Sequence, residues 1–167
     1  FNANYGGLPK NVWLHVTGKL YQTLPLYSNL KTTGVYVYAS DMRIKARTAI
    51  INAESEVRNE TGKTQIAEYK VSIYDRDGSF IKSWGSEAVE IPAGETVTLK
   101  ASSLVEKLNF WSWGYGYLYD VKTALVVDGK VVDEVNTRTG FRKTRFAEGK
   151  IWLNDRVLQM KGFAQRT

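Results

Sequence analysis

The chain has 167 residues and no cysteine, which excludes disulfide frameworks, thiolate metal sites and cysteine nucleophiles. Its hydrophobic fraction of 43% and aromatic fraction of 13% are typical of a packed globular protein. The net charge is +6, with acidic residues scattered among the basic ones, so we expect a solvated basic surface and no nucleic-acid partner. No run of about 20 apolar residues is present, and a membrane span is not predicted.

Period-two apolar runs rich in β-branched and aromatic residues follow one another along the chain and predict strands. The predicted strands are Val12–Thr17, Gly34–Ala39, Ile44–Ala53, Ile66–Tyr74, Phe80–Trp84, Ala88–Ile91, Thr96–Lys100, Leu118–Val127 and Val131–Val135. Asp77-Gly78 and Asp128-Gly129 are hairpin-turn signals. The single helical signal is one turn at Ser102–Lys107, with Ser103 as its N-cap.

About seven strands between Gly34 and Thr137 predict an all-β, immunoglobulin-like antiparallel β-sandwich. Three further short strands come after it, at Lys143–Phe146, Lys150–Leu153 and Val157–Met160. We expect the short extra strands at both ends to lie outside the sandwich and to dock on something else. The start at Phe1 has no signal-peptide pattern, and we interpret it as a cut within a longer protein.

Four segments spread over the chain carry a family resemblance. Gly6–Leu14 (GGLPKNVWL) resembles the end of the N-terminal jelly-roll domain of family 2 glycoside hydrolases, the β-galactosidase and β-glucuronidase group. Phe110–Val121 (FWSWGYGYLYDV) resembles a segment of that family's immunoglobulin-like domain. Thr139–Arg142 (TGFR) resembles the junction after it, and Leu153–Phe163 (LNDRVLQMKGF) resembles the start of the catalytic barrel.

The resemblance implies a division into three parts. Residues 1–32 would be the end of the jelly-roll domain and a linker, residues 33–138 the immunoglobulin-like sandwich, and residues 139–167 the truncated start of a TIM barrel. It also implies that a parent enzyme hydrolyses β-glycosides with retention, using two glutamates beyond Thr167. The chain itself is then a non-catalytic scaffold between its jelly-roll and barrel neighbours. A periplasmic or secreted parent enzyme is compatible with this hypothesis.

The sequence departs from the family pattern at several positions. Lys10 stands where arginine is usual, and Trp113 and Gly116 replace residues that are commonly proline. Ala164, Gln165 and Arg166 stand where many members have asparagine, arginine and histidine. The last difference points to a subgroup with another sugar preference.

The aromatic cluster of residues 111–119 is the candidate binding site. Trp111, Trp113 and Tyr115, together with Arg166, are the predicted substrate-binding residues. Two interpretations stay open: packing against a neighbouring domain, or stacking on sugar rings in a stand-alone carbohydrate-binding module. Strand alternation places Tyr117 and Tyr119 on one side and Leu118 toward the core.

No catalytic residue, metal site or cofactor is predicted in the chain. His15, the single histidine, lies in a strand pattern and is expected to be structural or exposed. Asn59-Glu60 matches the asparagine-glutamate pair of the family's acid/base residue, but lies in a polar turn pattern, where Asn59-Glu60-Thr61 is also a glycosylation acceptor sequence. The pairs Glu54/Glu56 and Asp75/Asp77 are expected to be solvated edges.

Overall fold

The computed structural model describes residues 12, 14–25 and 30–162, and within them it contains twelve strands and no helix. The strands are β1 (Leu20–Gln22), β2 (Val35–Arg43), β3 (Thr48–Asn59), β4 (Gln65–Tyr74), β5 (Phe80–Gly85), β6 (Val89–Ile91), β7 (Thr96–Val105), β8 (Tyr119–Val127), β9 (Lys130–Thr139), β10 (Thr144–Ala147), β11 (Lys150–Leu153) and β12 (Arg156–Leu158).

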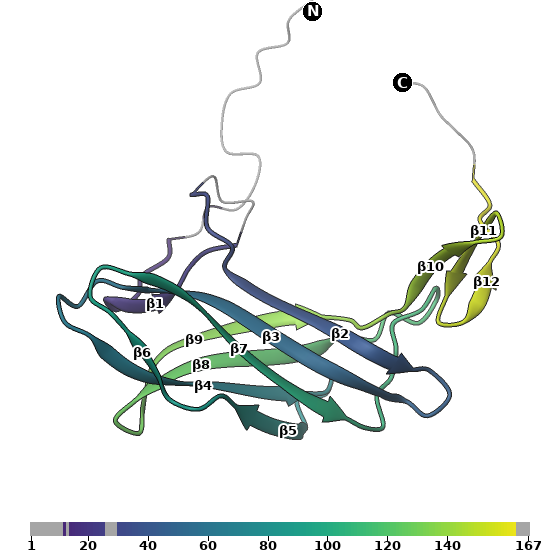
Figure 1. Ribbon diagram of the computed structural model, residues 1–167. Coiled ribbons are helices and arrows are strands. Elements are labelled where there is room, and N and C mark those ends of the chain that lie inside the picture. The colour runs from purple at the N-terminus through teal and green to yellow at the C-terminus, as the bar shows by residue number, and fades with distance from the viewer. Residues whose placement is uncertain (1–11, 13, 26–29, 163–167) are drawn as a thin grey trace, which may run out of the picture.

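Two antiparallel sheets form the body of the molecule (Figure 1). In the first sheet β3 pairs with β1 and β2 on one edge and with β7 on the other. The second sheet has the order β5-β4-β8-β9, and β6 also pairs with β4. The predicted immunoglobulin-like β-sandwich is confirmed.

The core lies between the sheets because every second side chain of the central strands points inward. β3 shows this alternation over its full length, with Ala49, Ile51, Ala53 and Val57 on its buried side. A fully buried valine or isoleucine side chain contributes about 1.5–3 kcal/mol relative to an exposed one. The period-two pattern read from the sequence is therefore also the pattern that holds the sheets together.

β1 belongs to the sandwich, although the sequence placed everything before residue 33 outside it. Leu20 pairs with Asn59 and Gln22 with Val57, and both β1 side chains are buried. The Gln22 amide bonds to Thr123 and Asp133 of the second sheet and accepts hydrogen bonds from Ser55 and Thr123. The expectation that no strand before residue 33 joins the sandwich is therefore wrong for β1.

Three further local predictions are wrong. Val12 and residues 14–17 form no strand with the described residues, and the Leu14 side chain is 89% exposed. Ser102–Val105 continue β7 and make no helical turn, because Ile50 and Leu104 pair across β3 and β7. Residues 44–47 form the turn between β2 and β3, so the predicted strand at Ile44 begins only at Thr48.

The two hairpin signals are confirmed. Asp128 and Gly129 have φ angles of 49° and 73°, and they join β8 to β9 with the backbone that such a two-residue turn requires. The other turn joins β4 to β5, with Gly78 at a φ of 82°. There Asp75 Oδ1 accepts hydrogen bonds from the Asp77 and Ser79 backbone amides.

The last three strands form a small antiparallel sheet of their own, β10-β11-β12, which we call the meander. These strands pair with one another and lie outside the two sheets of the sandwich, as expected. The meander lies beyond the end of the sandwich where the β2–β3 turn is found, whereas β1 lies at the opposite end (Figure 1).

Candidate functional site

The aromatic loop, residues 108–118, connects β7 to β8 at the meander end of the sandwich. The Ser112 and Tyr115 backbones hydrogen bond to each other in both directions at 2.9 Å, which folds Trp113 and Gly114 into a tight turn. Gly114 has a φ of 72°, a conformation that costs glycine little. The turn projects Trp113 into solvent, where 79% of it is exposed, and leaves Tyr115 46% exposed.

The base of this loop is buried in the sandwich. Tyr117 and Tyr119 pack with ring centroids 5.0 Å apart, and Tyr119 also lies 5.5 Å from Phe141. Burial raises the pKa of Tyr119 to about 12, and its hydroxyl accepts a hydrogen bond from the Asn109 amide. Tyr117 and Tyr119 do face the same side, but that side is the core. The prediction that Leu118 points to the core is wrong, since it is only half-buried.

Trp111 joins the sandwich to the meander. Its backbone amide donates to Phe141 O, and its carbonyl accepts from Asn154 Nδ2 at 2.9 Å. The Arg142 guanidinium lies 5.1 Å from the Trp111 ring centroid, a cation–π distance. Gly140 lets these groups approach, because a Cβ there would lie 2.8 Å from Tyr117 O and 3.0 Å from Trp111 Cβ.

Asn154 is the other half of this junction. It occupies the β11–β12 turn with a φ of 49°, and its Oδ1 accepts from the Lys143 amide at 3.0 Å. The Lys143 ammonium in turn pairs with Asp155 at 2.8 Å. The Trp111 bond ties the meander to the aromatic loop, and the Lys143 contacts tie the β11–β12 turn to the segment leading into β10.

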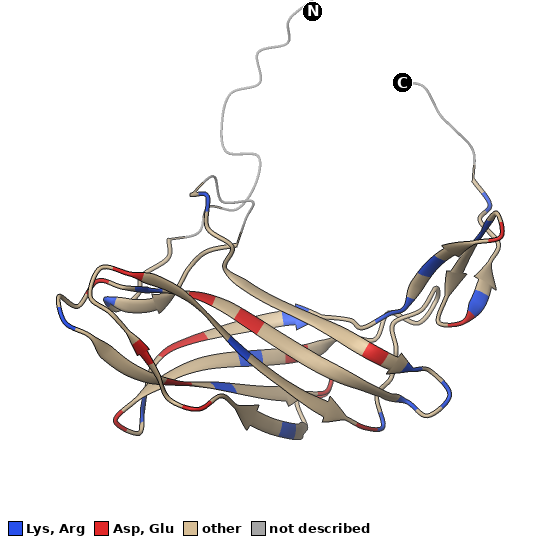
Figure 2. Ribbon diagram, in the orientation of Figure 1, with Lys and Arg blue, Asp and Glu red and all other residues tan. Residues whose placement is uncertain are grey.

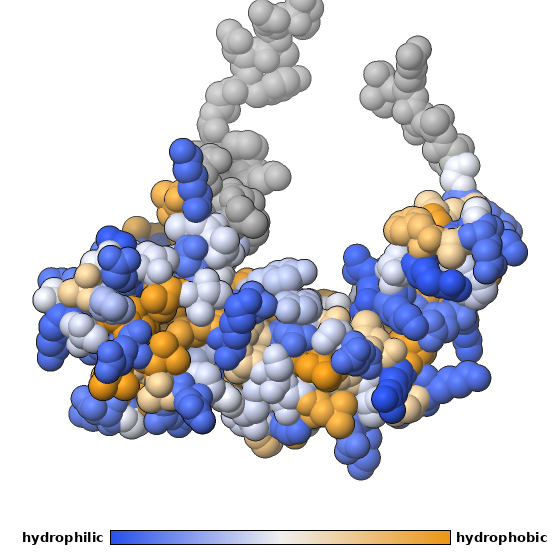
Figure 3. Space-filling model, in the orientation of Figure 1, coloured by the Kyte–Doolittle hydropathy of each residue, from blue (hydrophilic) through white to orange (hydrophobic). Residues whose placement is uncertain are grey.

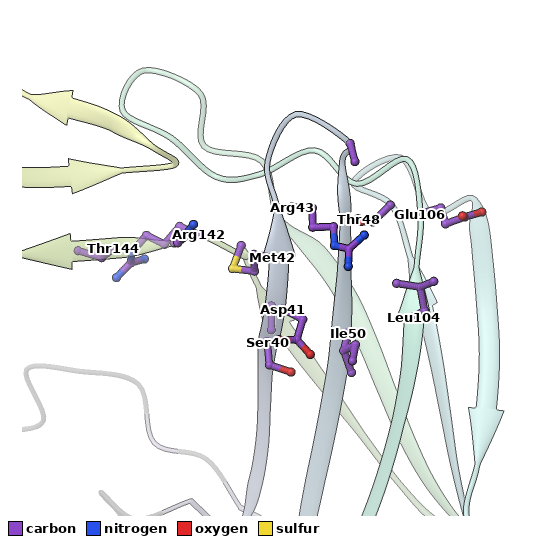
Figure 4. Close-up of a pocket in the computed structure, with 13 residues that line it drawn as sticks. Ser40, Asp41, Met42, Arg43, Thr48, Ile50, Leu104, Glu106, Arg142 and Thr144 are labelled. Carbon is purple, nitrogen blue, oxygen red and sulfur yellow. The ribbon is translucent and has the colours of Figure 1, made fainter.

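An open trough of about 910 Å³ lies beside this junction (Figure 4). Leu104 and Glu106 border it from the β7 side, and Arg142 and Thr144 approach from the stretch leading into β10. Arg43 and Asp41 at the end of β2 complete its charged rim. The charge of the trough is mixed, since its lining contains both cations and carboxylates.

A second depression of about 410 Å³, which we call the loop pocket, lies between the aromatic loop, the β2–β3 turn and the β11–β12 turn. Trp113 and Tyr115 line one side, and Asn154 and Arg156 line another. Arg47 enters from the β2–β3 turn, and its Nε and Nη2 donate to the carbonyls of Leu108 and Lys107 and to Asn109 Oδ1 at 2.7–3.0 Å. Its lining contains two arginines and no carboxylate.

The sequence-predicted binding residues are separated by the structure. Trp113 and Tyr115 lie together in the loop pocket, whereas Trp111 does not line it and holds the junction instead. Arg166 lies outside the described residues. Sequence reasoning missed Arg47 and Arg156, since nothing local marks either arginine and only the fold brings them to one pocket.

The other sequence candidates occupy structural positions. Asn59 is fully buried and donates from Nδ2 to the carbonyls of Lys63, Ile91 and Pro92, so it does not lie in a surface loop as expected. Glu60 is exposed and pairs with Arg58 at 3.6 Å. Asp75 stabilises the β4–β5 turn by accepting hydrogen bonds from the Asp77 and Ser79 backbone amides. His15 is exposed.

Glu54 and Glu56 point to the outer side of β3. Lys100 lies 3.1 Å from Glu54, and Tyr38 donates a hydrogen bond to it; both contacts lower the pKa of that carboxyl. Glu56 accepts hydrogen bonds from the hydroxyls of Thr23 and Thr33. Local partners thus favour the charged form of Glu54, and threonine hydroxyls occupy the oxygens of Glu56.

Exposed apolar side chains gather on the meander as well as on the sandwich (Figure 3). Phe146 and Met160 are 76% and 73% exposed there. In the described part of the chain no group of three or more His, Asp or Glu side chains is placed to hold a metal ion. Among the same residues no helix has the length and apolar character of a membrane span.

Comparison with known proteins gives consistent matches. The model of the family "Glycosyl hydrolases family 2" matches residues 35–142. A beta-glucuronidase of Formosa agariphila is 30% identical over 167 residues, which is 99% of this chain and 17% of that protein. A beta-galactosidase of Bacteroides ovatus is 24% identical over 93% of this chain and 17% of its own length.

Solved structures agree with these matches. The structure of a beta-glucuronidase from glycoside hydrolase family 2 matches with a TM-score of 0.80 and 29% identity, over 89% of this chain and 15% of that one. Beta-glucuronidase 2 of Bacteroides uniformis has the same fold here, with a TM-score of 0.73 at 22% identity, over 87% of this chain and 17% of that one. The chain therefore spans about a sixth of the length of the proteins it resembles.

Proposed function

Because this chain belongs to glycosyl hydrolase family 2, we propose that it is the non-catalytic β-sandwich of a longer retaining glycoside hydrolase, and that it holds the neighbouring domains in position. The match to the family model carries the proposal, since it covers the sandwich. Beta-glucuronidase is the name of the 30% identical relative and of the 29% identical structure. A β-glucuronide is therefore the better-supported substrate, ahead of the β-galactoside expected from the sequence.

The carboxylates of the described residues suit a structural role. Retaining hydrolysis needs two carboxyl groups about 5–5.5 Å apart, and the acid among them needs a raised pKa. Glu54 has the opposite shift, caused by Lys100 and Tyr38, and its neighbour Glu56 is occupied by threonine hydroxyls. Glu60 pairs with Arg58 on the surface. These environments support a catalytic pair outside this chain.

The scaffold role is supported by the way both ends of the sandwich are fastened. At one end β1 is bonded into the interior through Gln22. At the other end Asn154 ties the meander to the aromatic loop. A sandwich anchored in this way transmits the position of a domain on the β1 side to a domain on the meander side. Since β1 belongs to the sandwich, we assign only the residues before it to the jelly-roll end and linker, and residues 139–167 to the barrel start, as the family resemblance implies.

A stand-alone carbohydrate-binding module is not favoured. The matched proteins are named as glycoside hydrolases and are far longer than this chain. An independent sugar-binding module would not require a sequence match to them over nearly its full length. The aromatic loop instead lies at the junction with the meander.

Hydrolysis assays test the proposal. The purified chain is incubated with p-nitrophenyl β-glucuronide, β-galactoside and β-mannoside, and we expect no turnover above buffer. Glu60→Gln and Glu54→Gln are the matched variants. Turnover that either variant abolishes would place a catalytic carboxylate in this chain and refute the non-catalytic assignment.

A further inference from the structure

The charge of the molecule is unevenly placed in space. Residues 41–47, 106–107 and 142–161 contain ten Lys or Arg against four Asp or Glu, a net charge of +6 that equals the charge of the whole chain. The rest of the chain is neutral, with thirteen of each sign. Lys and Arg accordingly gather on the β2–β3 turn and the meander (Figure 2). The positive charge that the sequence shows as scattered is thus gathered at one end by the fold.

This excess of positive charge is also poorly compensated locally. Five of the six ion pairs among the described residues lie in the neutral remainder, and only Lys143–Asp155 lies at the basic end. Like charges that gather without partners repel one another and reduce stability. A basic end of this kind also concentrates anionic ligands near it.

The loop pocket gives this end a specific place for an anion. The three contacts that hold Arg47 use Nε and Nη2, which leaves the Nη1 protons directed away from those carbonyls. Arg156 is exposed across the pocket and has no ion pair within residues 12, 14–25 and 30–162. Guanidinium groups bind carboxylates through paired hydrogen bonds, and one held in advance loses less entropy on binding.

The same pocket has aromatic surface for an apolar ring face. Trp113 and Tyr115 are exposed on its rim, and Ser112 and Asn109 add hydrogen-bonding side chains. Its volume of about 410 Å³ lies in the range of small-molecule sites. A ligand with a carboxylate, hydroxyl groups and a flat C–H face would contact the arginines, the hydrogen-bonding side chains and the aromatic rings of the pocket, respectively.

We infer that the loop pocket is a non-catalytic binding site for uronic-acid residues of an anionic glycan. The sugar carboxylate is held by Arg47 and Arg156, the ring lies against Trp113 and Tyr115, and the basic end draws the glycan to the site. The choice of a uronate rests on the β-glucuronide substrate proposed above. The site would hold an acidic polysaccharide on the sandwich while a distant active centre cleaves it.

The test is calorimetric titration of the 167-residue chain with a β-1,4-linked trimer of glucuronic acid. Cellotriose is the matched neutral probe, because it has the same linkage and lacks the carboxylates. We expect saturable binding of the triglucuronate, at least about tenfold weaker binding of cellotriose, and weaker triglucuronate binding in high salt. Equal affinity for the two sugars, or no binding of the triglucuronate, would overturn the inference.

Variants locate the site. Arg156→Gln and Trp113→Ala change exposed side chains, and each is expected to weaken binding about tenfold with an unchanged melting temperature. Lys130→Gln removes the same charge at the β8–β9 turn, away from the pocket, and should leave the affinity unchanged. If Lys130→Gln weakens binding as much as Arg156→Gln does, the interaction is diffuse and the inference is wrong.

Poly-glutamate is the third probe. Affinity for poly-glutamate equal to that for the uronate trimer would show that the basic end recognises acidic polypeptide, and would overturn the assignment to a glycan. Absence of glycan binding leaves the scaffold proposal standing, since that proposal is tested by hydrolysis. Conversely, hydrolysis lost in Glu60→Gln would refute the scaffold proposal without touching the binding result.

Discussion

Replacing Gln22 tests whether β1 is an integral part of the sandwich. In Gln22→Ala the chain loses two hydrogen bonds donated by Nε2, to Thr123 O and Asp133 Oδ2, and two accepted by Oε1, from Ser55 and Thr123. Ser55 keeps its bond with the Tyr69 hydroxyl at 2.7 Å, so part of the network survives. Each hydrogen bond contributes about 1 kcal/mol, and a buried group left unpaired costs more. We therefore expect the free energy of unfolding to fall by about 2–4 kcal/mol.

Urea denaturation followed by tryptophan fluorescence measures this loss. Tyr21→Ala is the matched control, because Tyr21 lies between Leu20 and Gln22 on the outer side of β1 and is half-buried. The double variant Gln22→Ala/Ser55→Ala should cost less than the sum of the single variants, since the two side chains bond to each other. If Gln22→Ala lowers the free energy of unfolding by an amount within about 0.5 kcal/mol of that for Tyr21→Ala, the Gln22 hydrogen bonds do not anchor β1 and the reasoning is refuted.

Three other changes are predicted to have measurable effects. Asn59→Ala leaves buried carbonyls unpaired and should lower the free energy of unfolding, measured by urea denaturation, by about 2–4 kcal/mol. Because Asn59 is buried, the wild-type chain made in a glycosylating host should show no glycan mass. A glycan on Asn59 would contradict this burial. Burial raises the pKa of Tyr69 to about 12, so the unfolded chain loses this proton first, and the free energy of unfolding should fall between about pH 10 and about pH 12. Tyr69→Phe should make that fall shallower, and an unchanged slope would contradict the shift. Gly140→Ala places a Cβ 2.8 Å from Tyr117 O and should lower stability by about 1–3 kcal/mol and speed tryptic cleavage of the meander, whereas Gly162→Ala, with nothing within 4 Å, should do neither.

The sandwich could be predicted from the sequence because its signals are local. Alternation over β3 and the Asp128-Gly129 turn each specify a conformation within a few residues. The residues preceding β1 show how the same signal fails: Val12, Leu14 and Val16 alternate, yet they are exposed, and no described strand pairs with them. Period-two spacing indicates which side chains share a face, but a partner strand decides whether that face is buried.

Features that depend on distant contacts could not be predicted. Nothing in Leu20-Tyr21-Gln22 marks a strand, because Gln22 is a polar residue whose burial is stabilised only by groups from β3, β8 and β9. The loop pocket likewise depends on contacts between residues that are distant in the sequence. Trp113 was identified from its aromatic neighbours, whereas Arg47 and Arg156 become neighbours of Trp113 only when the meander folds back.

The two anchors of the sandwich differ in kind, and the difference bears on how a longer enzyme would move. β1 is held by a buried network in which Gln22 bonds to both sheets, so releasing it leaves polar groups unpaired in the interior. The meander is tied to the aromatic loop by the part-buried hydrogen bond from Asn154 Nδ2 to Trp111 O, whose groups water can satisfy on release. Opening the second anchor therefore costs less than opening the first. If the proposed barrel follows the sandwich, motion between the two is expected at the meander, where the loop pocket lies, and the proposed glycan bound across that pocket would stiffen the weaker joint.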